Sequence, residues 1–165
     1  MKKSLFVVLV ILLQSCLIKT QLVSNKQAGY TGKPKKIFIM MVGSAETNDF
    51  SEGMLAGMIQ KFKEKNIVCD GLVSFELSKE TNEDFAKGID NYKPDASLMI
   101  NLQETRVMGY GPMGGRFDLT LTDRRTKQQV WTGSLNVSGH LDSKATINKT
   151  IDSIIGKLTE DGIVE

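Results

Sequence analysis

KIFIMMV, residues 36–42, is a continuous apolar stretch of strand length, and Gly43-Ser44 ends it. Such a stretch suits a strand that is buried on both faces of a sheet, because apolar and polar residues do not alternate along it. We therefore expect 36–42 to be a central strand. Apolar residues then recur at helical spacing between 50 and 62, which predicts a helix with one apolar face packed against that strand.

The pattern after residue 65 predicts the rest of a single domain. We expect a strand at 67–77, a helix at 82–92, a strand at 96–106, two hairpin strands around 117–122 and 130–137, and a helix at 143–160. The order βαβαβββα implies one compact α/β (α+β) domain over 35–165. Its mixed sheet should hold about five strands with about three helices, and parallel crossovers should precede an antiparallel meander.

The first fifteen residues have the composition of a secretion signal. Lys2 and Lys3 precede nine consecutive large apolar residues at 5–13, a stretch too short to span a bilayer. The sequence Leu13-Gln14-Ser15-Cys16 resembles the lipobox of bacterial lipoproteins, although Gln14 stands where that motif usually has a small or apolar residue. We expect cleavage after 15 and lipid on Cys16. The alternatives are an ordinary signal peptide with an incidental cysteine, or retention as a membrane helix.

Charge restricts how the mature chain could be held at a membrane. The chain has 21 basic and 19 acidic residues, and removal of 1–15 takes away two lysines and no acid, which leaves a net charge of zero. Binding of nucleic acid, or of anionic headgroups by a basic patch, needs surplus positive charge. We therefore expect lipid to supply the attachment. The polar stretch 16–34 should be a flexible tether, and 17–20 carry no acidic sorting signal, which favours the periplasmic face of the outer membrane.

Residue types that common catalytic mechanisms require are scarce. His140 is the only histidine and is expected in an exposed loop, and Cys69 is the only other cysteine and is expected to be a buried small side chain. Metal sites need several such ligands, so the sequence predicts no metal, no cofactor and no enzymatic activity.

Two glycine-containing segments are candidate ligand sites. The segment 109–114 formally matches G-x-G-x-x-G, but it joins two predicted strands and contains Pro112, so we interpret the match as accidental. The loop 43–47 lies between a buried strand and a helix, where an α/β sheet can form a ligand crevice. A small-ligand carrier or an enzyme that uses this crevice is the alternative function.

The loop 108–115 is the preferred candidate for binding a partner. It combines four glycines with Met108, Tyr110 and Met113, so it could adapt its shape while it presents apolar side chains. The simpler interpretation is an ordinary hairpin tip. The favoured function is that of a non-enzymatic binding or adaptor protein for another envelope protein, in envelope assembly or wall synthesis.

The second half of the chain resembles a known group. The residues that carry the likeness are Lys93-Pro94-Asp95, Gly115-Arg116-Phe117, Asp123-Arg124-Arg125-Thr126 and Val130-Trp131-Thr132-Gly133. They are similar to envelope lipoproteins of the penicillin-binding-protein activator LpoB type and to TolB amino-terminal-like domains. The resemblance covers about 36–160 and implies the fold and a non-catalytic role, without identifying a partner or any binding residue.

Overall fold

The computed structural model describes residues 18–75, 79–109 and 111–165. The predicted signal peptide at 1–15, the predicted lipid-bearing Cys16 and the candidate partner residue Tyr110 lie outside these residues.

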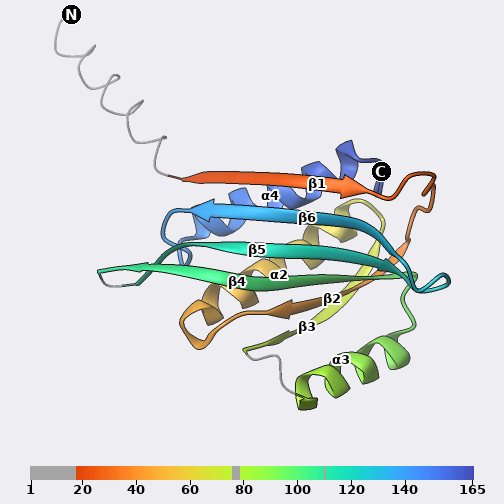
Figure 1. Cartoon of the computed structure of the whole chain (residues 1–165), viewed down its shortest axis with the longest axis horizontal. Helices are drawn as coiled ribbons and strands as arrows, with labels where there is room; N and C mark the ends of the chain where they lie inside the picture. Colours follow the sequence, from red (N-terminus) through yellow and green to blue (C-terminus); the bar gives the residue numbers. More distant parts are fainter. Residues whose placement is uncertain (1–17, 76–78, 110) are drawn as a thin grey trace, which may run out of the picture.

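The chain forms one six-stranded mixed sheet with helices on both faces (Figure 1). The elements are β1 (Lys19–Lys26), β2 (Lys36–Val42), the short 3-10 helix η2 (Ala45–Thr47), α2 (Asn48–Glu64), β3 (Val68–Ser74), α3 (Lys79–Tyr92), β4 (Ala96–Met108), β5 (Gly111–Asp123), β6 (Gln129–Ser138) and α4 (Lys144–Glu160). Their order in the sheet is β1-β6-β5-β4-β2-β3. The predicted α+β fold is confirmed, with one strand more than expected.

The stretch 36–42 is an interior strand of the sheet, as its sequence predicts. β2 pairs in parallel with both β3 and β4, and its residues from Ile37 to Val42 are all buried. β4, β5 and β6 then pair antiparallel in chain order. The expected succession of parallel crossovers and meander is therefore present.

The main core lies between the sheet and the helices α2 and α4. Apolar residues of β5 and β6 alternate inward and meet the buried faces of both helices, as shown by Phe117, Leu119, Met54, Met58 and Ile154. A smaller cluster on the opposite face packs Phe85 of α3 against Phe38, Met40 and Val42. The predicted inward faces of all three helices are thus packed against the sheet. No helix in the described ranges is both long and apolar enough to cross a bilayer.

Several bounds differ from the predictions. β3 ends at Ser74 where the prediction ends at 77, and α3 begins at Lys79 where the prediction begins at 82. The stretch 16–34, expected to be a flexible tether, contains β1, which pairs along its whole length with β6. The predicted loop 108–115 is largely strand, because β4 continues to Met108 and β5 begins at Gly111. Two irregularities in the β4–β5 register, after Leu102 and after Thr105, accommodate this long hairpin.

Asp161 fixes β1 and β6 to the end of α4. Its carboxylate accepts hydrogen bonds from Ser24 Oγ at 2.5 Å and from Trp131 Nε1 at 2.7 Å, and it lies 3.3 Å from Lys157 Nζ. Its carbonyl oxygen accepts a bond from Lys26 Nζ at 3.0 Å. Burial alone would raise the pKa of this carboxyl, but the three side-chain bonds outweigh burial and lower it.

Asp95, which follows Pro94 in the Lys-Pro-Asp segment, aligns two parallel strands. Its Oδ2 accepts hydrogen bonds from the backbone N–H groups of Lys35 and Lys36, each at 2.9 Å. Its own N–H donates to the Lys36 carbonyl at 2.8 Å. The acid thus satisfies donors that would otherwise be unpaired where β2 begins.

Candidate functional site

The candidate site is a cavity of about 580 Å³ at the end of the sheet where β1 begins and β4 turns into β5. Four separate segments contribute to it: the start of β1, both arms of the β4–β5 hairpin, the loop after β6 and the first turn of α4. The lining residues are Ile18, Arg106, Met108, Met113, Ser138, Gly139, His140, Ser143 and Thr146.

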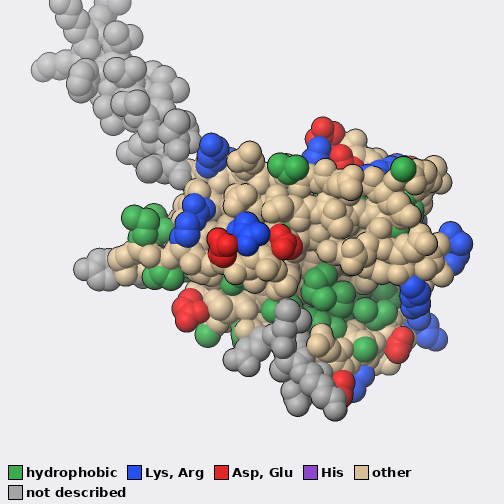
Figure 2. All heavy atoms as spheres, in the orientation of Figure 1, with side chains coloured by type: hydrophobic (Ala, Val, Ile, Leu, Met, Phe, Trp, Pro, Cys, Tyr) green, Lys and Arg blue, Asp and Glu red, His purple; other side chains and the backbone are tan. Residues whose placement is uncertain are grey.

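Two of the three predicted partner-binding residues line this cavity. Met108 and Met113 approach it from opposite arms of the hairpin, and the third, Tyr110, lies outside the described residues. Met108 is 68% exposed and its neighbour Val107 is 60% exposed. In Figure 2, hydrophobic side chains gather at the same end of the molecule, where the hairpin projects. The hairpin therefore presents apolar surface to solvent beside the cavity.

Backbone bonds hold the hairpin against the loop after β6. The Met113 carbonyl accepts from the N–H of Gly139 at 3.1 Å, and the Pro112 carbonyl accepts from the N–H of Leu141 at 3.0 Å. Leu141 is fully buried, so this loop is itself anchored in the core. The wall of the cavity is consequently built from hydrogen-bonded backbone rather than from a free loop.

Arg106 crosses from β4 over the start of β5 to β6. Its Nη2 donates to the Val137 carbonyl at 2.8 Å and to Ser138 Oγ at 3.2 Å. Gly114 lies beneath this crossing with φ at +147°, and a Cβ there would stand 2.4 Å from the Val137 carbonyl oxygen. Only glycine fits this position, because both the backbone angle and the space exclude a side chain.

The polar wall comes from the cap of α4. Ser143 Oγ accepts from the Thr146 N–H at 3.2 Å and is 2.8 Å from the Thr146 hydroxyl. The Ser143 side chain is thereby the N-cap that satisfies a donor of the first turn. These two hydroxyls hydrogen-bond with each other. The ionisable side chains of the lining are Arg106 and His140.

Ile18 brings the beginning of the described chain into the same site. Its carbonyl accepts from Lys149 Nζ of α4 at 2.7 Å, and the following residue, Lys19, pairs with Ser138. Sequence reasoning missed this contribution because 16–34 reads as a polar tether. Half-buried side chains alternate with exposed ones along 19–26, but three of the four, Thr20, Ser24 and Lys26, are polar, so the sequence carries no apolar alternation that would mark a strand.

The chemistry of the lining favours binding of an apolar group with an anionic neighbour. The lining combines an isoleucine and two methionines with an arginine and a histidine, and it contains no carboxylate. His140 is exposed, as predicted. Within the described ranges, no group of three or more His, Cys, Asp or Glu residues is placed to hold a metal ion.

The alternative crevice at 43–47 is filled by its own side chains. Thr47 Oγ1 accepts from the Ser44 N–H at 2.9 Å and donates to the Ser44 carbonyl at 3.1 Å. A Cβ on Gly43 would stand 2.6 Å from Ser51 Oγ. The polar groups of this loop therefore close the end of β2 onto the start of α2.

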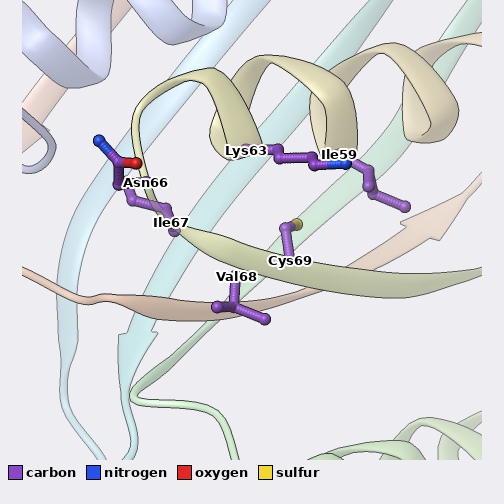
Figure 3. Close-up of a pocket in the computed structure, with 6 residues that line it drawn as sticks. All are labelled: Ile59, Lys63, Asn66, Ile67, Val68 and Cys69. Atoms are coloured by element: carbon purple, nitrogen blue, oxygen red, sulfur yellow. The ribbon is translucent and has the colours of Figure 1, made fainter.

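A second cavity, of about 450 Å³, lies where α2 meets the start of β3 (Figure 3). The sulfur of Cys69 is directed toward α2, whereas Val68 points to the other side of the strand. Burial, with the nearby Asp70 carboxylate, raises the pKa of the Cys69 thiol to about 12. The thiol is therefore protonated at neutral pH and unsuited to nucleophilic chemistry.

Comparison with known proteins gives a likeness of fold. No protein-family model matches the chain, and no curated protein matches it. A PelC dodecamer from Paraburkholderia phytofirmans is similar in structure, with a TM-score of 0.56 and 15% identity over 89% of this chain and 99% of the other. A dodecamer of a single-residue variant of that PelC gives a TM-score of 0.54 and 15% identity over 90% and 99%.

Proposed function

We propose that this protein is a bacterial lipoprotein, anchored through lipid on Cys16, that acts as a non-enzymatic adaptor on the periplasmic face of the outer membrane. The signal-like residues 1–15 and the lipobox-like sequence that ends at Cys16 support the anchor. The similarity in fold to PelC is consistent with this role.

The single observation that carries the adaptor role is the apolar cavity beside the start of β1. Because β1 begins at Lys19, the domain follows Cys16 with almost no linker. The cavity therefore lies next to the anchor, and Met113 presents a flexible, polarisable side chain to it. A partner in the same envelope layer would meet this surface at a fixed height above the membrane.

The partner could also include further copies of this chain. The similar PelC structures are dodecamers, and the sheet leaves β1 and β3 as unpaired edges in the described chain. Edge strands can add a strand from another molecule. We propose self-association accordingly, and mass photometry of the detergent-solubilised protein tests it: a discrete oligomer is expected, and a monomer at every concentration would contradict it.

Photo-crosslinking in intact cells tests the adaptor role. A benzophenone amino acid is placed at Met113 in the cavity, and at Leu72 on the opposite edge strand, which is 40% exposed, as the control. We expect an envelope protein other than a further copy of this chain to be captured from position 113 and not from position 72. Capture of the same envelope protein from both positions, or of none from either, would contradict a partner site in the cavity.

A further inference from the structure

We infer that the projecting end of the β4–β5 hairpin, through Val107 and Met108 at the end of β4, enters the surface of the lipid bilayer that holds the anchor. This inference rests on the proposed lipidation of Cys16, and it assigns to the hairpin a second membrane contact beyond the lipid itself.

The first argument is the length of chain between the anchor and the cavity. Ile18 lines the cavity with Met108, and one residue separates Ile18 from Cys16. Two residues of fully extended chain span about 7 Å, so the lipidated sulfur cannot lie far from this end of the domain. Because the acyl chains must be in the bilayer, the end that contains Ile18 is held against the bilayer surface.

The second argument is the exposure of the hairpin tip. Most large apolar side chains of this domain are buried, yet Val107 and Met108 are adjacent in sequence and are 60% and 68% exposed. Figure 1 shows the hairpin projecting past the neighbouring strands, at the end of the sheet where β1 begins. A pair of exposed apolar residues at the end of a projecting hairpin can be buried by shallow insertion between lipid headgroups.

The third argument is the charge around the tip. The cavity wall carries the cation Arg106, and it has no carboxylate. Glu104, on the same strand, is paired with Arg116 at 2.8 Å, and Asp142 is exposed in the loop before α4. A long side chain such as Arg106 can keep its stem along apolar surface while its guanidinium contacts lipid phosphates.

When the end of the domain that contains Ile18 lies against the bilayer, Val68 provides a matched control for Val107. Val68 is 61% exposed, almost the same as Val107, but it begins β3 and pairs with Lys36 at the opposite end of the sheet. Val68 should therefore face away from the membrane whenever Val107 touches it.

The test uses full-length protein, purified from membranes and reconstituted into phosphatidylcholine vesicles whose acyl chains are brominated near the headgroup. Val107→Trp and Val68→Trp are compared, with Met108→Trp as a second tip variant should the first fold poorly. Bromine quenches tryptophan only on close approach. The native Trp131 is 1% exposed and gives the same background in every variant. The mass of the N-terminal peptide is measured on the same samples.

We expect an acylated Cys16 together with loss of roughly half of the added emission at position 107 or 108, and little loss at position 68, because shallow insertion places the tip about 5–10 Å into the interface. Acylated protein with no quenching at the tip, or with equal quenching at all positions, would overturn the membrane contact and leave the anchor intact. An unmodified Cys16 in the mature protein would overturn the proposed anchor, and this inference with it.

Discussion

Replacing Asp161 with alanine should destabilise the fold more than replacing any exposed acid, because one carboxylate joins two strands to the end of α4. Trp131 is 1% exposed, and its Nε1 donates to Asp161 at 2.7 Å. An unsatisfied buried donor costs about 1–3 kcal/mol, and loss of the charge-assisted bond from Ser24 adds about 1 kcal/mol. We expect a total loss of about 2–4 kcal/mol in the free energy of unfolding.

The assay is equilibrium unfolding in urea, followed by far-ultraviolet circular dichroism, since the fluorescence of Trp131 would change directly with its partner. Asp152→Ala is the control, because that carboxylate pairs with Lys61 at 3.3 Å but is 64% exposed. An exposed pair contributes about 0–1 kcal/mol. If Asp161→Ala lost no more stability than Asp152→Ala, the conclusion that Asp161 fixes β1 and β6 to the end of α4 would be refuted.

The stability difference between the wild type and an Asp161 variant should depend on pH with a definite sign. The pKa of Asp161 is lowered in the folded protein from its ordinary value of 3.8. A lowered folded-state pKa gives stability that is present above the unfolded pKa and is lost as the pH falls through the folded value. The stability difference between wild type and Asp161→Asn should therefore be constant near neutral pH and shrink below about pH 4. A difference that widened in acid would contradict this reasoning.

Three other perturbations follow from the described contacts. Gly114→Ala should destabilise the fold by about 2–3 kcal/mol, because its Cβ would meet the Val137 carbonyl, whereas Gly111→Ala in the same strand meets nothing within 4 Å and should change the melting temperature little. Cys69 should react with iodoacetamide at pH 8 roughly a hundred-fold more slowly than glutathione, as followed by mass spectrometry, because its pKa is about 12; equal rates would refute this. Asp123→Ala should cost about 1 kcal/mol in urea unfolding, because Asp123 Oδ1 accepts bonds from the Thr126 N–H and hydroxyl, and an unchanged midpoint would contradict that role.

The interior of the fold could be predicted from the sequence because its signals are local. The uninterrupted apolar stretch 36–42 identified the interior strand β2, and helical spacing identified the inward faces of α2 and α4. The predicted start of the last helix differs from the observed one by a single residue, because Ser143 is its cap. Each of these features depends on residues close together in the chain.

The edge strand β1 could not be predicted in the same way. Its inward side chains include Thr20, Ser24 and Lys26, which are polar and resemble a linker. Their partners are distant in sequence, namely Ser153 Oγ at 2.7 Å from Thr20 Oγ1, and Asp161 for the other two. Polar residues that order a strand through such long-range bonds leave no periodic apolar signal.

Only part of the candidate site could be predicted, because the rest of it depends on contacts between residues distant in sequence. The composition of the loop 108–115 singles out Met108 and Met113, and both line the cavity; their binding of a partner stays a prediction. Ile18 and Thr146 come from the two ends of the chain, and their approach depends on the pairing of β1 with β6 and on the placement of α4. Neither of these long-range arrangements can be inferred from the sequence of the loop 108–115.

The most direct test of the anchor is metabolic labelling with a clickable fatty acid in cells that express the wild type, Cys16→Ser or Cys69→Ser. The chain has two cysteines, so the second variant is the matched control. A lipoprotein anchored at Cys16 should carry label in the wild type and in Cys69→Ser and lose it in Cys16→Ser. Label that persists in Cys16→Ser, or that is absent from the wild type, would contradict the account.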